Sequence, residues 1–369
     1  MLLGAADRGG GAELAVTTAA LIPTELRVSR VTGADFAGSW RRTVDRLVDS
    51  RLAHAAEWFR VIREAYGHEP LYLEAEDEDG GYGVLPAFIV RRPILGPIVS
   101  SMPFLDGGGP AASSAPLAAA LVTRLVEEAR DAGAPVVELR SIRRLGVPSE
   151  PEEHKVNLTL ALPADPVRLW QQLDGSVRNQ VRKAGRSGLT VELGGSEKLD
   201  EFYPIFATRM RELGSPAHAR RFFGAILDTF GHRARVALVR KGSAPVGGLI
   251  AVAFKDVLAV PWASCLRRYL PLCPNMLLYW ETIRAACLEG FARFDFGRST
   301  RGSSTYRFKR QWGAQEEPLF WYTITSGGRR RPSRPGTGRG AALLAGCWRR
   351  LPFALTRSLG PHIRGYLTQ

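Results

Sequence analysis

The sequence lacks any apolar run long enough to cross a bilayer. The longest such runs, residues 248–254 and 341–348, are far shorter than the ~20 residues that a membrane-spanning helix needs. The first residues also lack the basic start and apolar block of a secretory signal, because Asp7, Arg8 and Glu13 interrupt a short apolar stretch. The sequence therefore predicts a cytoplasmic protein without a transmembrane helix.

Cysteine is scarce and scattered. The four cysteines, Cys265, Cys273, Cys287 and Cys347, are separated by eight, fourteen and sixty positions, and none forms a Cys-x-x-Cys pair. This spacing does not fit a zinc site or a disulfide framework, so we predict reduced thiols and no metal site. A catalytic thiol at Cys265 is the alternative.

Acidic residues are missing from residues 329–369, which contain nine arginines. The net charge of the whole chain is +14, so subtracting these nine leaves +5 for the residues before them. The basic tail predicts an anionic partner such as membrane headgroups, nucleic acid or a polyphosphate. With 369 residues, of which 45% are hydrophobic and 23% charged, the chain is otherwise typical of a globular protein with two domains.

The C-terminal half shows a regular succession of helix and strand patterns. Apolar residues recur every three to four positions in the predicted helices and alternate in the predicted strands. Short polar turns join the three central strands, which favours antiparallel hairpins. In order, the sequence predicts a strand at 189–193, helices at 199–213 and 222–230, strands at 235–240, 246–254 and 257–263, a helix at 275–289, a strand at 292–296, a helix at 303–311 and a strand at 319–324. This order matches the GNAT fold.

The N-terminal half repeats the pattern in a shorter form. The predicted elements are a strand at 26–28, a helix at 58–66, strands at 71–75 and 82–90, a helix at 116–132 and a strand at 136–139. The acidic run 74–79 lies between two of these strands and is interpreted as a hairpin turn rather than a metal site. We therefore predict an α+β protein of two tandem GNAT-like units, each a mostly antiparallel mixed sheet flanked by helices.

Changes in composition suggest the domain boundaries. Pro163 to Pro166 marks a junction, and the Arg/Pro/Gly-rich residues 327–340 are typical of a linker. The predicted segments are an N-terminal extension (1–22), a degenerate GNAT-like domain (23–162), a C-terminal GNAT-like domain (163–326) and a basic tail (327–369). Aromatic residues, leucines and arginines in the tail favour a membrane-surface segment outside the catalytic core. A tail that packs on the core or stays disordered is the alternative.

Polar residues gather around the predicted strand at 292–296. Alternation places Phe294 and Phe296 on one face and Asp295 on the other, and Gly297 is predicted to end the strand. Loops that follow strands commonly hold functional sites. We expect the residues next to Asp295 to form such a site.

Charged groups near this loop suit acyl transfer. Asp295 is predicted to accept a proton from an attacking amine or to orient Arg298. Lys309 is predicted to stabilise the oxyanion that forms when an acyl carbon is attacked. Ser299 and Tyr306 complete the predicted group.

The helix predicted at 275–289 adds further candidates. Asn275 is a predicted N-cap, beside backbone N–H groups that favour an anion, and a plain cap without a ligand is the alternative. The preceding basic loop, 266–269, lacks the Gly-rich turn typical of acetyl-CoA binding. Glu281 is predicted to pair with an arginine such as Arg284. Trp262 is predicted to lie in the core or to line the substrate groove.

Together these segments resemble FemAB-related proteins of exosortase/PEP-CTERM systems, within the FemAB-like branch of the GNAT acyltransferases. The similarity covers about residues 26–322 and extends to 350–352. It rests on the segments 137–140, 210–216, 274–281, 294–299 and 306–313. One departure is Ser303-Ser304-Thr305, where the family often has Ser-Gly-Thr, and the added side chain would narrow the loop near Lys309.

The resemblance implies groove residues on a cationic helix and on a glycine-rich loop. In the family both segments border the substrate groove. The implied residues are Arg178, Asn179, Arg182 and Lys183 on the helix, and Phe104, Asp106 and Gly108 on the loop. Arginine suits anionic oxygens because of its planar fork of donors. A solvated basic helix face and a loop without a ligand are the alternatives.

The family further implies an activity. Fem proteins add amino acids from aminoacyl-tRNA to peptidoglycan precursors, so the resemblance implies a bacterial acyltransferase or aminoacyltransferase that acts on an amine or hydroxyl of a cell-envelope or exopolysaccharide precursor. Aminoacyl-tRNA or acyl-CoA would be a co-substrate, with no bound cofactor and no metal. The implied partners are the precursor, tRNA and the anionic inner face of the cytoplasmic membrane. An acetyl-CoA-dependent polysaccharide O- or N-acetyltransferase and a non-catalytic precursor-binding module are the alternatives.

Overall fold

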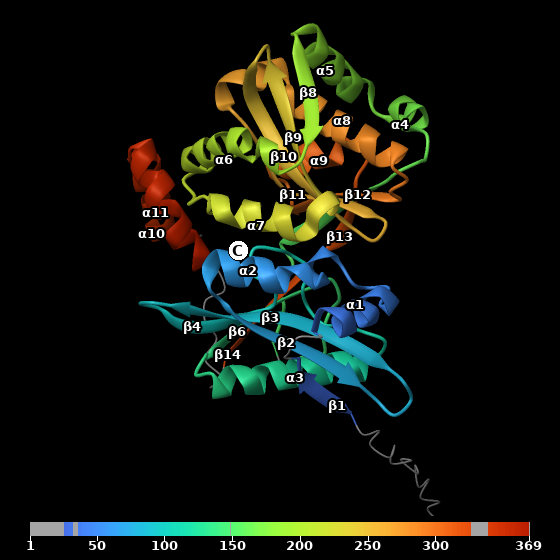
Figure 1. Ribbon diagram of the computed structural model, residues 1–369, viewed down its shortest axis with the longest axis vertical. Coiled ribbons are helices and arrows are strands. Elements are labelled where there is room, and N and C mark those ends of the chain that lie inside the picture. The colour runs from blue at the N-terminus through green and yellow to red at the C-terminus, as the bar shows by residue number, and fades with distance from the viewer. Residues whose placement is uncertain (1–25, 32–35, 148, 326–338, 369) are drawn as a thin grey trace, which may run out of the picture.

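The computed structural model describes residues 26–31, 36–147, 149–325 and 339–368. Its two sheets lie one above the other in Figure 1, with helices α2 (Glu57–Tyr66) and α7 (Arg220–Phe230) between them. The two helices pack against each other. Their buried residues belong to one apolar cluster that contains side chains from both halves of the chain. The two units therefore share a core at their interface.

The first sheet comes mainly from the N-terminal half. Its strand order is β1-β2-β3-β4-β6-β14, with β5 paired to β3, and only β4 and β6 run parallel. Its strands are β1 (Arg27–Arg30), β2 (Glu69–Glu76), β3 (Tyr82–Arg92), β4 (Gly96–Ser100), β5 (Ala111–Ala112), β6 (Val136–Ser141) and β14 (Phe320–Thr325). Helix α3 (Ala115–Asp131) covers one face, while α1 (Phe36–Arg46) and α2 cover the other.

The second sheet comes mainly from the C-terminal half, in the order β13-β7-β12-β11-β10-β9-β8. Its strands are β7 (Lys155–Ala161), β8 (Leu189–Gly194), β9 (Ala234–Lys241), β10 (Ala244–Phe254), β11 (Val257–Cys265), β12 (Arg293–Thr300) and β13 (Gln315–Pro318). The helices are α4 (Pro166–Gln172), α5 (Gly175–Arg186), α6 (Leu199–Leu213), α8 (Pro274–Leu288) and α9 (Ser304–Arg310). Helices α5 and α8 cover one face, and α6 and α7 the other.

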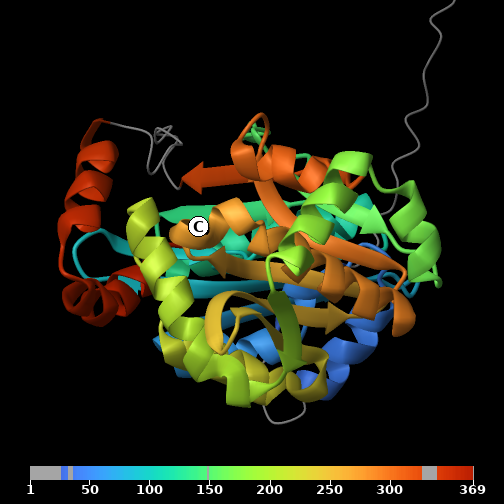
Figure 2. The same cartoon turned by 90° about the horizontal axis from the view of Figure 1, so that it is seen from above.

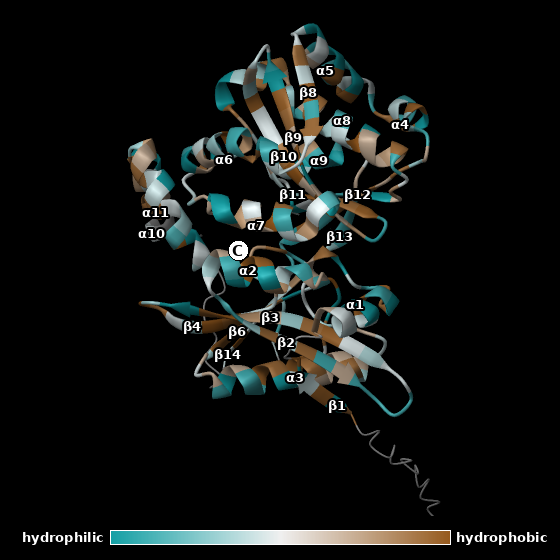
Figure 3. Cartoon of the chain, in the orientation of Figure 1, coloured by the Kyte–Doolittle hydropathy of each residue, from teal (hydrophilic) through white to brown (hydrophobic). Residues whose placement is uncertain are grey.

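The sequence patterns and the observed elements agree over most of the chain. The predicted helices at 199–213, 222–230 and 275–289 are α6, α7 and α8, and the three predicted hairpin strands are β9, β10 and β11. Figure 3 shows hydrophobic residues concentrated along the strands of both sheets. The acidic run 74–79 ends β2 and turns toward β3, as predicted. The predicted α+β fold class is confirmed.

Two strands cross the predicted boundary between the units. β7 lies before residue 162 but pairs with β12 and β13 in the C-terminal sheet. β14, the strand predicted at 319–324, pairs instead with β6 in the N-terminal sheet. Each sheet therefore includes one strand from the other side of the predicted junction at 163–166.

The tail forms two helices, α10 (Arg339–Arg350) and α11 (Phe353–Gly365), which pack on α6. Figure 2 shows them along one side of the molecule. Gly365 packs on Tyr66, and Gly360 lies against Ala217, so α11 approaches both units closely. This corrects the prediction that the tail lies outside the core; its contact with a membrane stays a prediction. The extension 1–22 and most of the predicted linker lie outside the described residues.

No helix in the described part of the chain is both long and apolar enough to span a bilayer.

Candidate active site

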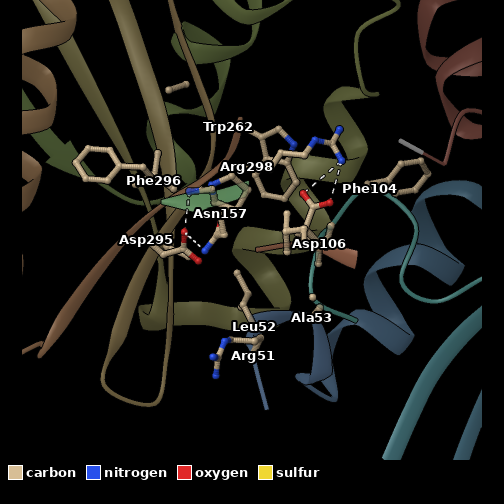
Figure 4. Close-up of a pocket in the computed structure, with 18 of the residues that line it drawn as sticks. Arg51, Leu52, Ala53, Phe104, Asp106, Asn157, Trp262, Asp295, Phe296 and Arg298 are labelled. Carbon is tan, nitrogen blue, oxygen red and sulfur yellow. Dashed lines mark hydrogen bonds and ion pairs between the residues drawn. The ribbon is translucent and has the colours of Figure 1, made fainter. Parts of the chain in front are cut away.

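A cavity of about 320 Å³ lies between the two units. The N-terminal unit contributes residues 51–53 and the loop 104–107 to its walls. The C-terminal unit contributes β11 and β12, and α11 adds Arg364. Figure 4 shows side chains from both units pointing toward this space.

Strand β12 carries a bulge that aims two charged side chains into the cavity. Between Asp295 and Arg298, two residues, Phe296 and Gly297, oppose a single residue of β7. Gly297 has a φ of 72°, which glycine adopts without strain. Residues three apart would face opposite sides of a regular strand, but the bulge lets Asp295 and Arg298 both line the cavity. The strand continues to Thr300, so the prediction that Gly297 ends it is wrong.

Strands β11 and β12 separate at the cavity. They pair in parallel only from Val257 to Ala259 and from Arg293 to Asp295. β11 then continues beside β10 and β12 beside β7, and residues 260–263 line the cavity. We call this opening, beyond Ala259 and Asp295, the C-terminal splay. Beyond these residues the two strands no longer pair with each other, which leaves room for the cavity.

Asp295 presents a carboxylate in this opening. Its Oδ1 accepts hydrogen bonds from Asn157 Nδ2 at 2.9 Å and from the Gly297 N–H at 2.7 Å. Burial raises the pKa of Asp295, and these two hydrogen bonds oppose the rise. In the described part of the chain no hydrogen bond reaches Oδ2. A carboxylate with a raised pKa and a free oxygen is suited to accept a proton.

Lys309 approaches the same site from α9. It is 9% exposed, and its Nζ donates to the carbonyl oxygens of Gly297 at 2.9 Å and Arg298 at 2.7 Å. Burial lowers the pKa of Lys309 to about 8, although the charges of Asp295 and Asp106 oppose the change. The third Nζ proton remains for a group in the cavity. A cation held in this way can stabilise negative charge that develops on an acyl oxygen.

Arg298 connects the two units across the cavity. Its Nη1 lies 3.1 Å from Asp106 Oδ1 in the N-terminal loop, as Figure 4 shows. The guanidinium also lies 5.2 Å from the ring centroid of Trp321 on β14. Because both contacts hold the side chain in place, Arg298 fixes the loop 104–107 against the C-terminal splay.

The geometry suits general base catalysis with charge stabilisation, and it does not use a thiol. Cys265 is buried on β11 and does not line the cavity. Burial raises the pKa of Cys265 to about 12, so the thiol stays protonated at neutral pH. Among the described residues, no three His, Cys, Asp or Glu side chains gather closely enough to hold a metal ion.

Six of the predicted site residues meet in the cavity. They are Phe104, Asp106, Trp262, Asp295, Arg298 and Lys309. They come from a loop of one unit and from β11, β12 and α9 of the other. The structure therefore brings the loop with Phe104 and Asp106 next to the segment with Asp295 and Arg298, although the two are far apart in the sequence. Their catalytic and binding roles stay predictions.

Three neighbouring candidates do not line the cavity. Beyond the bulge, Ser299 returns to the buried face of β12 and is 4% exposed. The Tyr306 hydroxyl donates to Glu316 at the edge of the sheet. Gly108 packs beneath its own loop, where a Cβ would lie 2.5 Å from Met102 Cβ. Gly108 therefore shapes the loop instead of facing the cavity.

The candidates on α8 also lie outside the cavity. Pro274 opens the helix and Cys273 is its N-cap, so Asn275 is not the cap that the sequence predicted. Proline takes this first position because its fixed φ suits a helix start. Glu281 pairs with Arg284 at 2.8 Å, the ion pair that the sequence predicted.

The cationic face of α5 lies apart from the cavity as well. Val177 and Val181 are buried against α8, while Asn179, Arg182 and Lys183 are exposed and Arg178 is partly exposed. Arg182 stacks 5.5 Å from the ring centroid of Trp170. In the structure this surface does not border the cavity, so a role for it requires a ligand that reaches the outer face of the unit.

Sequence reasoning missed several cavity residues. Asn157, which hydrogen-bonds Asp295, lies on β7, and the alternating residues 155–161 could have revealed that strand. His218 and Arg364 come from a loop and from the tail, and no local pattern marks either of them. Only tertiary packing brings them to the cavity.

Comparisons with known proteins agree with this architecture. Residues 173–310 match the family described as acetyltransferase (GNAT) domain. This match covers less than half of the chain. No curated protein matches the chain by sequence. The domain supports acyltransferase activity in general, because it contains α9 and most of the C-terminal splay.

Solved structures show that the fold extends over both units. The crystal structure of FemX has a TM-score of 0.61 and 13% identity, covering 81% of this chain and 97% of that chain. A tandem GNAT protein from the clavulanic acid biosynthesis pathway has a TM-score of 0.51 and 10% identity, covering 83% and 100%. The C-terminal domain of a lysylphosphatidylglycerol synthetase from Agrobacterium fabrum has a TM-score of 0.50 and 15% identity, covering 84% and 95%. The fold is a tandem GNAT arrangement.

Proposed function

We propose that this protein transfers an activated acyl or aminoacyl group directly to an amine or hydroxyl of a cell-envelope or exopolysaccharide precursor. The observation that carries the proposal is that Asp295 and Lys309 both line the cavity beside the β12 bulge, between the two units. One group can accept a proton and the other can stabilise an oxyanion, which are the two requirements of acyl transfer.

In the proposed reaction the acceptor nitrogen or oxygen attacks the acyl carbon of the donor. The new bond forms as Asp295 takes the proton of the nucleophile, and Lys309 stabilises the charge on the acyl oxygen. The bond to the leaving CoA thiolate or tRNA alkoxide then breaks, and Asp295 passes the proton to that group. The enzyme forms no covalent intermediate.

The donor is proposed to be aminoacyl-tRNA or acyl-CoA, bound as a co-substrate. Resemblance to FemAB-related proteins of exosortase/PEP-CTERM systems favours an envelope acceptor. The family description, acetyltransferase, favours acetyl-CoA and hence O- or N-acetylation of a polysaccharide. Against acetyl-CoA, the segment before α8 is the 3₁₀ turn Arg267–Leu272, which contains Pro271 instead of a Gly-rich turn.

Mass spectrometry of acylated acceptors tests the proposal. The purified protein is incubated with an envelope-precursor extract and either acetyl-CoA or charged tRNA. We expect a mass increase of one acyl group with wild type and none above background with Asp295→Asn. Acceptor binding by both proteins without any transfer would favour the non-catalytic binding module.

We further propose tRNA as a partner of the arginines on the cationic face of α5. If Arg178 and Arg182 contact phosphates, binding of charged tRNA should weaken steeply as salt increases. Arg178→Ala with Arg182→Ala should reduce the slope of log affinity against log salt by about 2, because each phosphate contact contributes close to one unit. An unchanged slope would remove tRNA from this surface.

An anionic membrane is the proposed partner of the tail, at the inner face of the cytoplasmic membrane. Leu355, Leu359 and Ile363 on α11, and Tyr366 directly after it, are 39% to 48% exposed. Residues 329–369 contain no acidic residue. The exposed β3–β4 turn, with Ile94 94% exposed, lies on the same side of the molecule in Figures 1 and 2. Apolar side chains among arginines suit a headgroup boundary.

Vesicle sedimentation tests this partner. Leu359→Asp with Ile363→Asp should abolish sedimentation with vesicles of anionic lipid, whereas Leu288→Asp, an exposed leucine on α8, should not. Equal sedimentation of all three proteins would exclude this helix face as the membrane contact.

A further inference from the structure

Helix α11 inserts a guanidinium into the wall of the candidate active site. Arg364 lies near the end of the helix and lines the cavity with Phe104 and His218. The side chain lies deep in the protein but keeps partial accessibility, because it faces the cavity. The tail thus supplies a charged group to a cavity that is otherwise built by the two GNAT units.

The side chain is held by neutral groups. Its Nε donates to His218 Nε2 at 3.1 Å, and His218 Nδ1 lies 2.7 Å from the Tyr66 hydroxyl. Burial lowers the pKa of His218 well below its usual value, so the imidazole is neutral and accepts at Nε2. The guanidinium also lies 5.6 Å from the ring centroid of Phe104. These contacts fix the side chain without neutralising its charge.

Arg364 has no acidic partner among the described residues. Two other arginines near the cavity do: Arg298 lies 3.1 Å from Asp106, and Arg140 lies 3.8 Å from Glu138. The Nη1 and Nη2 groups of Arg364 make no hydrogen bond to the described part of the chain. Burial lowers the pKa of Arg364 to about 10, so the group remains cationic at neutral pH. Buried charges are normally paired, which indicates that a ligand completes this one.

We propose that Arg364 is an anion-binding residue of the active site and that the substrate carries a carboxylate or phosphate group there. Nε already bonds His218, so Nη1 and Nη2 remain to bind two anionic oxygens end-on. The charges of Arg298 and Arg140 also act on this position and add to its positive potential. The proposal deepens the proposed function, because it assigns an anionic group to one of the two substrates.

Binding of simple anions tests the assignment without any transfer reaction. Titrations of inorganic phosphate and of acetate into the full-length protein, at constant ionic strength, are followed by calorimetry. Arg364→Met should weaken binding of the preferred anion at least about tenfold, the loss of a charge-assisted bidentate contact. Arg357→Met is the matched control, because Arg357 lies exposed on the same helix. Stronger binding of phosphate or of acetate identifies the anion.

Arg364→Lys provides a second variant if the methionine variant does not fold. It keeps the charge but loses the fork, so binding should fall between those of wild type and Arg364→Met. Equal anion affinity in wild type and the folded Arg364 variants would overturn the proposal, as would an equal loss in Arg357→Met. Once a substrate is known, Arg364→Lys should raise KM more than it lowers kcat. Asp295→Asn should leave anion binding intact. Loss of the proposed transfer role of Asp295 and loss of the proposed anion site at Arg364 would therefore be seen in different measurements.

Discussion

Each sheet contains one parallel strand pair whose strands separate, and the opening between the separated strands differs in the two sheets. In the C-terminal sheet, pairing of β11 and β12 stops after Ala259 and Asp295, and the cavity occupies the opening. In the N-terminal sheet, pairing of β4 and β6 stops after Ser100 and Glu138. Glu138 is therefore the positional counterpart of Asp295. Even their antiparallel neighbours correspond, because Thr323 pairs with Glu138 and Thr159 with Asp295.

The N-terminal opening, which we call the N-terminal splay, is filled by protein. The loop 101–110 returns through it, and the Gly109 N–H donates to the Arg140 carbonyl at 2.8 Å. Arg140 is 2% exposed and donates to the carbonyl oxygens of Leu105 at 2.9 Å and Thr368 at 2.5 Å. Thr368 in turn donates to Glu138 at 2.5 Å.

The same fold therefore supports a site in one unit and a structural contact in the other. In the N-terminal splay a buried arginine and the end of the tail satisfy the polar groups. In the C-terminal splay a bulge points Asp295 at empty space, and Lys309 supplies a cation. Substitutions in the N-terminal splay should therefore lower stability, whereas substitutions in the C-terminal splay should lower turnover.

The largest expected effect is on turnover in the C-terminal splay. Lys309→Met should lower kcat by about 10²–10³-fold, the usual cost of removing one oxyanion donor. A steady-state assay with the acceptor found by mass spectrometry measures it, and a melting curve controls for folding. A folded variant with wild-type kcat would place the oxyanion donor elsewhere.

Removing the buried cation of the N-terminal splay, Arg140, should lower stability. Arg140→Met leaves the carbonyl oxygen of Leu105 without a donor and the carbonyl oxygen of Thr368 with only the Phe104 N–H. This loss should cost about 3 kcal/mol of unfolding free energy. Urea unfolding measures this loss. If the folded variant instead kept its stability and lost turnover, the two splays would not differ as described.

The N-terminal splay should also be sensitive to acid. His54 Nε2 donates to the carbonyl of Gly109 at 2.8 Å, and burial lowers the pKa of His54 to about 4. The unfolded chain binds this proton near pH 6.5 but the folded chain does not, so stability falls with pH below 6.5, by about 2 kcal/mol at pH 5. His54→Gln should remove that part of the loss in urea unfolding at pH 7 and 5. An identical pH dependence in both proteins would count against a neutral His54.

The C-terminal splay should show its own pH dependence, in turnover. Lys309 loses its proton near pH 8, so kcat should fall about tenfold for each pH unit above that value. Lys309→Arg stays charged and should move the decline to higher pH. A pH–rate profile that is flat to pH 10 would show that the charge of Lys309 is not required.

Regular patterns made most of the fold predictable. The hairpins β9–β11 and the helices α6 to α8 have strong alternation or three-four periodicity and short polar turns. The exchange of β7 and β14 was not predictable in this way, because strand partners are chosen by long-range packing. The sequence analysis contains no strand at 155–161, and sequence order groups β14 with the C-terminal sheet, whereas β14 pairs with β6 in the N-terminal sheet.

Only the site residues that lie close together in the sequence were predictable. Asp295, Arg298 and Lys309 fall within fifteen residues and share the cavity. Glycine is typical both of a strand end and of a bulge, so the sequence does not distinguish the bulge at Gly297 from a strand end. Arg364 is 66 positions from Arg298, and its role depends on the docking of α11. Local patterns carry no information about such contacts.

The most direct test of the account compares Asp295→Asn with Glu138→Gln in one transfer assay. Both changes replace a carboxylate by an amide at equivalent positions of the two splays. Asp295→Asn should lower kcat by about 10²-fold or more while the protein stays folded. Glu138→Gln should leave kcat close to wild type. Similar kcat values for the two folded variants would contradict the claim that the C-terminal splay alone carries out acyl transfer.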